Sequence, residues 1–274
     1  MSIFCFANNQ IQAIDKAGVP VTDLLVQRGY GIFDFLRVAG DKPLFIDDHL
    51  DRFFHSAEKM RLTIPQTRED IKNIVKELIQ KNQLTYSGIR MIIAGGDAPD
   101  GYTIEHPHLI IIQAPLAEPT IHLPETGIKL ATYSYQRQIP DVKTTDYLMA
   151  VWLQPWMKQQ GADDILYYYN GILSECPRSN FFLVTKENVL VTAQQNMLNG
   201  ITRKNILKVC EAHSIPFQIR DININELKEA KEAFITSSTK RIIPVQQIDE
   251  FVFKSDYVSS VAKNIYELLV QLEH

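Results

Sequence analysis

The chain contains 274 residues, of which 45% are hydrophobic and 22% are charged, and its formal net charge is −4. This length suffices for one large domain or two modest domains, each with its own core. The slightly acidic balance excludes the basic surface by which proteins bind nucleic acids or anionic membranes. No apolar run of about 18 residues is present, so we expect no membrane-spanning helix.

Cysteine usage and the N-terminus bear on the cellular compartment. The three cysteines, Cys5, Cys176 and Cys210, are scattered and odd in number, which argues against a disulfide framework. The stretch MSIFCFANNQ lacks the basic region and the apolar core of a secretory signal. We therefore predict a cytoplasmic protein.

The first part of the chain, residues 1–114, predicts a small mixed domain. Asn8-Asn9 is typical of a hairpin turn, and Asp47 or Asp48 is placed to cap the first long helix. The predicted elements are a hairpin over 4–13, two strands within 33–46, helices over 49–61 and 67–82, and strands over 88–95 and 107–114.

Residues 115–124 contain three prolines and predict an interdomain linker. Residues 125–274 then predict a larger domain in which short strands alternate with helices. Its predicted elements are strands over 127–135, 163–171, 181–185, 189–193, 217–222 and 232–238, and helices over 145–160, 202–213 and 225–231. The mixture predicts a two-domain protein of the α/β or α+β class.

Two charged residues stand beside apolar stretches. Lys143 precedes what reads as a buried helix, and a buried ammonium group is costly unless it is paired or neutralised. It is therefore either an ordinary surface lysine or an amine kept for its reactivity. Glu175, between two apolar strands, is either a salt-bridge partner or a carboxylate that holds a protonated ring nitrogen.

Three further places suit a phosphate group. Ile201 and Thr202 follow a glycine at the start of a predicted helix, where free amides bind anions. Ser238 and Thr239 lie in a hydroxyl-rich strand end, and Arg52 carries a guanidinium that binds phosphate bidentately. Singly, each is more often a plain helix start, a turn or a surface arginine. Together with the amine and the carboxylate they make the set that pyridoxal phosphate requires.

The order of these motifs resembles that of the fold-type IV pyridoxal-phosphate enzymes. This group includes branched-chain aminotransferases, D-amino acid aminotransferases and aminodeoxychorismate lyases, and the similarity is greatest to bacterial D-amino acid aminotransferases. It covers most of the chain, through the motifs RGYGIFDFLRV, HLDRFFHSAEKMRLTIP, RQIPDVKTTDYL, GILSECPRSNFFLV, MLNGITRKNIL and EAFITSSTKRIIPV.

The resemblance implies a fold, a cofactor and a set of site residues. We expect a small N-terminal and a larger C-terminal domain, and a homodimer in which loops of one subunit complete the other's pocket. Lys143 matches the lysine that forms the Schiff base and shuttles a proton, and Glu175 matches the glutamate on the pyridine nitrogen. The remaining implied cofactor residues are Arg52, Ile201, Thr202, Ser238 and Thr239 for the phosphate, and Tyr147 for the phenolic oxygen.

The chain departs from the D-amino acid aminotransferases where the substrate carboxylate binds. Phe33 stands in place of a tyrosine, and Asp-Gly-Tyr at 100–102 replaces an Arg-x-His pair. A carboxylate entering a dry pocket needs a cation. We predict that Arg90 and Arg28 hold the substrate carboxylates, with Arg178 as a third candidate. No metal site is predicted, because no histidine or cysteine cluster has ligand spacing.

Two pocket arginines would favour dicarboxylates. The sequence therefore predicts a transaminase acting between a D-amino acid, such as D-alanine or D-glutamate, and a 2-oxo acid, such as 2-oxoglutarate or pyruvate. A branched-chain L-amino acid aminotransferase stays open, since Phe33 would supply part of an apolar pocket. An aminodeoxychorismate lyase stays open too, since the stretch KTTDYL resembles that group. An inert cofactor-binding protein is the non-enzyme alternative, although it would need neither Lys143 nor Glu175.

Overall fold

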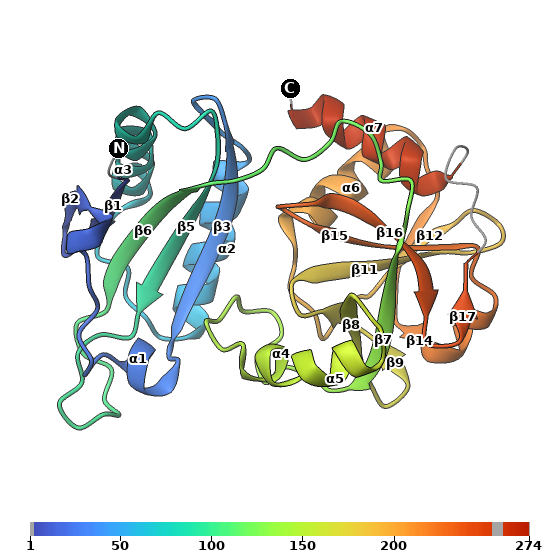
Figure 1. The fold of residues 1–274 in the computed structure, drawn as a ribbon, viewed down its shortest axis with the longest axis horizontal. Coiled ribbons are helices and arrows are strands. Elements are labelled where there is room, and N and C mark those ends of the chain that lie inside the picture. The colour runs from blue at the N-terminus through green and yellow to red at the C-terminus, as the bar shows by residue number, and fades with distance from the viewer. Residues whose placement is uncertain (1–2, 254–259, 274) are drawn as a thin grey trace. The chain divides into compact units, whose positions relative to one another are not determined.

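The structure is a computed structural model that describes residues 3–253 and 260–273 (Figure 1). The chain divides into two units: unit 1 comprises Met1–Glu118 and Val142–Asp146, and unit 2 comprises Pro119–Asp141 and Tyr147–His274. Each unit combines helices with one sheet, which confirms the predicted α/β (α+β) class. Among the described residues, no helix is long and apolar enough to cross a membrane.

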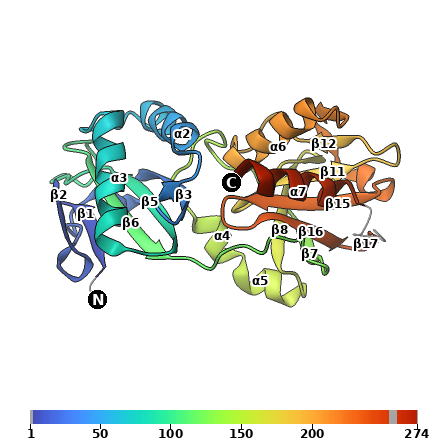
Figure 2. The same cartoon turned by 90° about the horizontal axis from the view of Figure 1, so that it is seen from above.

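Unit 1 is built on an antiparallel sheet of six strands in the order β2-β1-β6-β5-β3-β4. Helices α2 and α3 cover one face of it (Figure 2). The strands are β1 (Phe4–Ala7), β2 (Gln10–Ala13), β3 (Gly31–Ala39), β4 (Lys42–Pro43), β5 (Tyr86–Ala94) and β6 (His108–Pro115), and the helices are η1 (Ile14–Lys16), α1 (Leu24–Arg28), α2 (Ile46–Lys59) and α3 (Arg68–Asn82).

Local sequence signals explain most of unit 1. Asn8 and Asn9 both have positive φ, which confirms the predicted hairpin turn. Thr67 and Asp70 cap each other's backbone amides at the start of α3. The predicted cap of α2 by Asp47 or Asp48 is wrong. That helix begins earlier, after Phe45, so both aspartates lie in its first turn. Their negative charges interact favourably there with the positive end of the helix dipole.

Strand alternation gives the sheet of unit 1 two different faces. On the face toward α2 and α3, Leu36 and Met91 are fully buried in the core. On the opposite face, Phe33 is partly buried and Arg90 is exposed. Because paired strands carry their side chains on shared faces, β3 and β5 bring an aromatic ring and a guanidinium to the same side.

Unit 2 is built on an 11-stranded mixed sheet with the path β13-β12-β11-β15-β16-β7-β8-β9-β14, with β10 on β11 and β17 on β16. Helices α6 and α7 pack on one face, over the stacked rings of Phe182 and Phe234. The strands are β7 (Ile128–Ser134), β8 (Asp164–Tyr169), β9 (Ile172–Leu173), β10 (Glu175–Cys176), β11 (Ser179–Val184), β12 (Leu190–Thr192), β13 (Phe217–Ile219), β14 (Ile222–Asn223), β15 (Glu232–Ser237), β16 (Arg241–Ile248) and β17 (Phe251–Val252). The helices are α4 (Leu148–Trp152), α5 (Gln154–Gln159), α6 (Ile201–Ala212), η2 (Ile224–Lys228) and α7 (Val261–Glu273).

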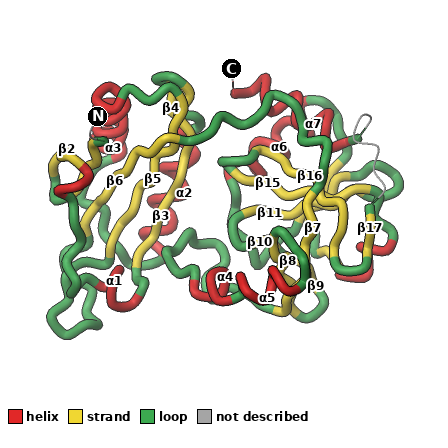
Figure 3. Tube along the Cα trace, viewed as in Figure 1, coloured by secondary structure: helices red, strands yellow, loops and turns green. Residues whose placement is uncertain are grey.

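The region after Lys143 differs from its prediction. The single buried helix predicted over 145–160 is replaced by two short helices, α4 and α5 (Figure 3). Neither of them contains a fully buried residue. Pro155 at the start of α5 explains the break, because proline cannot supply the amide that would continue α4. The predicted helix over 225–231 is the shorter 3₁₀ turn η2.

The division of the chain also differs from the simple order of domain, linker and domain. The boundary between Glu118 and Pro119 falls inside the stretch predicted as a linker, residues 115–124. However, Val142–Asp146 belongs to unit 1, whereas the sequence-based division placed it in the domain 125–274. The reason is a set of hydrogen bonds that this segment makes to β3.

Candidate active site

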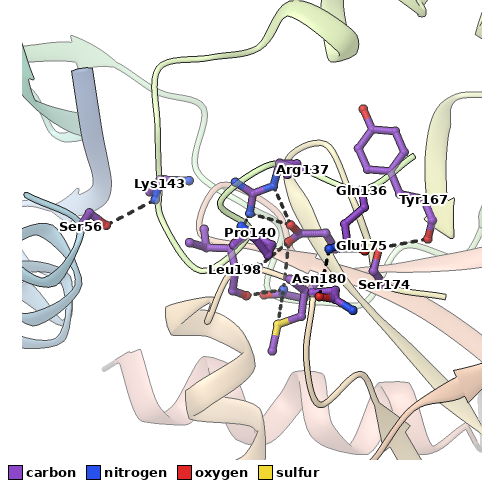
Figure 4. A network of polar contacts seen from close by, with 12 residues as sticks. Ser56, Gln136, Arg137, Pro140, Lys143, Tyr167, Ser174, Glu175, Asn180 and Leu198 are labelled. Atoms are coloured by element: carbon purple, nitrogen blue, oxygen red, sulfur yellow. Dashed lines mark hydrogen bonds and ion pairs between the residues drawn. The ribbon is translucent and has the colours of Figure 1, made fainter. Parts of the chain in front are cut away.

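Lys143 lies in an extended segment along the edge of β3. The Phe33 amide donates to the Lys143 carbonyl at 2.9 Å, and the Thr145 amide donates to the Gly31 carbonyl at 2.9 Å. The Lys143 amide donates to the Ser56 hydroxyl of α2 at 3.3 Å (Figure 4). Close approach requires the glycine, because a Cβ at Gly31 would lie 2.8 Å from the Ile93 carbonyl oxygen and 3.3 Å from Thr145 Oγ1. Backbone pairing, rather than a helix, therefore positions the lysine.

The side chains of Lys143 and Arg90 both contact one aromatic ring. Lys143 Nζ lies 4.5 Å from the centroid of Phe33, and Arg90 Cζ lies 5.3 Å from the same centroid. Both separations are typical of cation–π contacts. The structure thus brings together three predicted site residues of unit 1. Among the described residues, no carboxylate pairs with Arg90, so a structural ion pair does not account for it.

Arg52 is held in a buried cluster on the core side of β3. Its Nε and Nη2 atoms each donate to the Asp34 carboxylate at 2.8 Å, and His49 Nδ1 lies 2.7 Å from the same carboxylate. Asp34 is fully buried, and Arg52 is nearly so. Burial alone would raise the pKa of Asp34, but the charges and hydrogen bonds of Arg52 and His49 hold it well below its usual range.

His49 completes this cluster near Lys143. Burial lowers its pKa, Asp34 opposes that shift, and the nearby charges of Arg52 and Lys143 reinforce it. A neutral imidazole at this distance donates its Nδ1 proton to Asp34. Asp34 and His49 were not predicted as site residues from the sequence. The alternation of β3 gave the only available signal, because it turns an aspartate toward an apolar core.

In unit 2, the predicted site carboxylate Glu175 lies in a network of hydrogen bonds. Its side chain is buried and accepts hydrogen bonds at both oxygens (Figure 4). Arg137 Nε and Nη2 donate to Oε1 at 3.0 and 2.7 Å, and the Leu198 amide donates to Oε2 at 3.0 Å. Asn180 Nδ2 lies 3.4 Å from Oε2. This set of donors suits an ionised carboxylate, which only accepts.

Arg137 was also missed from the sequence. It lies in the motif RQIPDVKTTDYL, which carried the resemblance, but it received no role there. A buried carboxylate requires a cationic or hydrogen-bonding partner, which was the available signal. Its Nη2 also donates to the Pro140 carbonyl, so the loop before Lys143 and the Glu175 carboxylate share one guanidinium.

The start of α6 offers backbone amides to an anion. Gly200 is its N-cap, and no side chain caps the helix. A Cβ at Gly200 would lie 2.0 Å from Asn180 Oδ1, so a larger residue there would require the Asn180 side chain to move. Ile201 is buried and Thr202 is partly buried, and both lie in the first turn, where the backbone amides have no partner within the helix.

A row of side chains connects the carboxylate to this helix start. Glu175 lies directly opposite Asn180 on the neighbouring strand, and Asn180 lies opposite Thr236 on the next. Thr236 Oγ1 is buried and has no hydrogen-bond partner among the described residues. Ser238 and Thr239 follow in the turn after β15, and Thr239 Oγ1 lies 3.2 Å from the Ser237 hydroxyl.

Three further predicted residues lie at the end of α1, at the start of α4 and in the turn after Glu175. Tyr147 is the half-buried N-cap residue of α4 in unit 2. Arg28 ends α1 and is exposed, and a Cβ at Gly101 would lie 3.3 Å from its Nη2. Arg178 is exposed in the turn after Glu175. Burial raises the pKa of Asp164, and a backbone hydrogen bond from Ile165 and the nearby charge of Arg178 oppose this shift.

The donor sets of the two units fit pyridoxal phosphate. Unit 1 holds an amine and a guanidinium, and unit 2 holds an anchored carboxylate, a glycine-led helix start and an orphaned hydroxyl. These are the groups that bind an aldehyde, a ring nitrogen and a phosphate. Among the described residues, no cluster of three or more histidine, cysteine or acidic side chains is arranged to hold a metal ion.

Comparisons with known proteins address the same point. The sequence profile of the family described as Amino-transferase class IV matches residues 31–248. The chain is 26% identical to a D-alanine aminotransferase of Bacillus licheniformis over 268 residues, covering 96% of this chain and 94% of that protein.

Solved structures share the fold. A branched-chain aminotransferase from the archaeon Thermoproteus uzoniensis, with norvaline, has a TM-score of 0.88 at 22% identity, covering 100% of this chain and 96% of that chain. A putative 4-amino-4-deoxychorismate lyase from Legionella pneumophila has a TM-score of 0.85 at 24% identity, covering 94% and 96%. Another branched-chain amino acid aminotransferase of this fold, with a TM-score of 0.87 at 20% identity, was solved with pyridoxamine 5'-phosphate.

Proposed function

We propose a substrate class from one premise: this chain belongs to the class IV aminotransferases, the fold-type IV enzymes that use pyridoxal phosphate. The protein transfers an amino group between a D-amino acid and a 2-oxo acid, with preference for dicarboxylates such as D-glutamate and 2-oxoglutarate. The observation that carries this proposal is the position of Arg90, whose guanidinium shares the ring of Phe33 with the amine of Lys143.

The chemistry explains why that position matters. A substrate places its amino group at the reacting centre and its carboxylate one carbon away. A cation beside Lys143 is therefore within reach of a substrate carboxylate, and Arg90 has no carboxylate partner of its own among the described residues. Arg28, exposed beside the loop 100–102, is the second proposed carboxylate ligand. The similarity to a D-alanine aminotransferase supports the D-configuration.

The roles of the chain's own groups follow from their surroundings. Pyridoxal phosphate, when bound, supplies an aldehyde and a ring that withdraws electrons from the substrate's α-carbon. Lys143 Nζ holds the cofactor and then moves the proton of that carbon. Glu175, fixed by Arg137 and the Leu198 amide, accepts the ring N–H. Arg52, Ile201, Thr202, Ser238 and Thr239 would hold the phosphate, and Tyr147 would interact with the phenolic oxygen.

A homodimer is part of the proposal. The resemblance implies one, and unit 2 exposes three large apolar side chains on α4 that suit an interface. Leu148, Val151 and Trp152 are 72, 60 and 63% exposed. Light scattering of the purified protein would give the mass directly, and a monomer at micromolar concentration would contradict this part. The predicted domain limits and the cytoplasmic location also stay predictions.

A spectral half-reaction tests the substrate class. D-alanine, D-glutamate, L-leucine and L-glutamate are added separately to the purified holoenzyme, and the absorption band of the lysine-bound cofactor is followed. We expect the D-amino acids to bleach it, with D-glutamate the faster. Bleaching by L-leucine would instead support a branched-chain aminotransferase, which the apolar ring of Phe33 would also suit. A band stable to all four would leave the lyase or the inert binder.

Arg90→Met tests the carboxylate assignment in the same assay. We expect KM for D-glutamate to rise about tenfold or more, because a charge-assisted hydrogen bond is lost. Arg178→Met is the matched control, since that arginine is also exposed but lies in a turn of unit 2. Equal effects of the two changes would remove Arg90 from the substrate site.

A further inference from the structure

Arg203, in the first turn of α6, carries a buried charge that no acidic group balances. Arg203 is only 6% exposed. Its Nε donates to Thr192 Oγ1 at 3.2 Å, and its Nη2 donates to the Ala193 carbonyl at 2.9 Å. Both acceptors are neutral, and no carboxylate of the described residues pairs with it. Burial lowers its pKa, which is the sign of a charge removed from water without compensation.

The position of Arg203 makes this arrangement more costly. The first turn of a helix carries the positive end of its dipole, where a cation is disfavoured. Helical side chains lean toward the N-terminus, so the stem of Arg203 is expected to extend toward the start of α6. The Cβ of Arg203 lies 3.7 Å from where a Cβ of Gly200 would stand. Buried positive charge is thus concentrated at one end of α6.

A second observation points to a ligand at this place. Asn180 Oδ1 occupies the space against Gly200, and Asn180 lies directly opposite Thr236 on the adjacent strand. Cross-strand partners share a face, so the Thr236 hydroxyl lies on the same side as the helix start. This hydroxyl is buried without a hydrogen-bond partner among the described residues. Buried polar groups are rarely left unpaired, which indicates that an acceptor is supplied from outside the chain.

We propose that Arg203 is an electrostatic positioning residue of the anion site, whose buried charge is balanced by the doubly charged phosphate of the cofactor, and that Thr236 Oγ1 donates a hydrogen bond to the bound group. Arg203 does not contact the phosphate. Its charge acts on the phosphate electrostatically, at the start of α6. The inference rests on the proposed phosphate role of Ile201 and Thr202. It goes beyond that role by assigning the Arg203 guanidinium as a buried positive charge that the bound anion neutralises.

Thermal unfolding of the apoprotein and the holoenzyme tests this inference, with inorganic phosphate and pyridoxal phosphate as the added ligands. Arg203→Gln removes the charge and keeps amide donors for Thr192 and Ala193, whereas Arg203→Lys keeps the charge. We expect R203Q to weaken binding of both ligands by at least about tenfold. We expect R203K to bind within about threefold of the wild type. Apo R203Q should be at least as stable as the wild-type apoprotein, because an uncompensated charge is gone.

A purely structural role predicts the opposite pattern. R203Q would then destabilise the apoprotein and the holoenzyme equally, or fail to fold in both, and either result would overturn the proposal. Equal weakening by R203K and R203Q would overturn it too, since the charge would not matter. Thr202→Ala tests the phosphate site at the start of α6 independently of the role of Arg203. If neither ligand stabilises the wild type, and T202A changes nothing, the phosphate site assigned to α6 is wrong.

Discussion

Asp34 is the residue whose replacement should cost most in unit 1. The change Asp34→Asn keeps the shape of the side chain and removes the charge that two donors of Arg52 and one ring nitrogen of His49 engage. Because the cluster is buried, the Arg52 guanidinium would lose the counter-charge of Asp34 in a site that water does not reach. Breaking a buried ion pair from one side costs about 3–5 kcal/mol. Total stabilities are about 5–15 kcal/mol, so the loss would be a large share.

The measurement is thermal and urea-induced unfolding of wild type and D34N. We expect the melting temperature to fall by roughly 10 °C or more. The pKa of Asp34 lies well below its usual range in the folded state, so its stabilisation is complete above the unfolded pKa, near ~4. It is lost as the pH falls through the folded value. The difference between the two proteins should therefore be constant from about pH 5 to 8 and shrink below about pH 4.

Asp51→Asn is the matched control for this prediction. Asp51 also pairs with an arginine, Arg68, at 2.6 Å, but the two side chains are 62 and 46% exposed. Exposed pairs contribute about 0–1 kcal/mol, so D51N should leave the free energy of unfolding nearly unchanged. A D34N protein as stable as D51N would refute the reasoning. D34N should also weaken cofactor affinity, since the orientation of Arg52 depends on it.

Two further changes test unit 2. Arg137→Gln should lower kcat while the cofactor stays bound, by a factor of about ten or more, because Glu175 Oε1 loses two charge-assisted hydrogen bonds. Steady-state kinetics with saturating pyridoxal phosphate measures this, and Arg220→Gln, which breaks the more exposed pair with Glu226, should leave kcat unchanged. Gly200→Ala should weaken cofactor affinity in a fluorescence titration, because its Cβ would stand 2.0 Å from Asn180 Oδ1. Gly18→Ala, where nothing lies within 4 Å, is the control, and equal affinities would contradict the packing argument.

Local signals in the sequence predicted much of this fold. Asn8-Asn9 predicted the first hairpin, and the helical spacing of apolar residues predicted α2, α3 and α6 within a few residues. These elements are determined by turn chemistry and by one amphipathic face. The C-terminal helix α7 and strand β16 were not predicted, although both contribute to the core of unit 2.

Partners distant in sequence could not be predicted in the same way. The Glu175 carboxylate was recognised as needing a partner, but nothing local indicated that Arg137, 38 positions away, supplies it. The same holds for Asp34 and Arg52, which meet only because β3 and α2 pack together. The spacing of apolar residues after Lys143 predicted one buried helix, yet Pro155 divides it, and the side chains of both parts are only partly buried or exposed.

The hydrogen bonds between Val142–Asp146 and β3 limit how this protein can be dissected. In the sheet order, β4 pairs with β3 only at Val38 and Ala39, so the other end of that edge is covered by residues from far along the chain. A recombinant fragment ending at Glu118 would lose that cover and expose unpaired backbone groups of a twisted edge, a template for intermolecular association. Such a fragment should precipitate, whereas coexpression with a peptide containing residues 142–146 should keep it in solution. Limited digestion in the linker alone should likewise leave the two pieces associated, because residues 142–146 of the second piece belong to unit 1 and are hydrogen-bonded to β3.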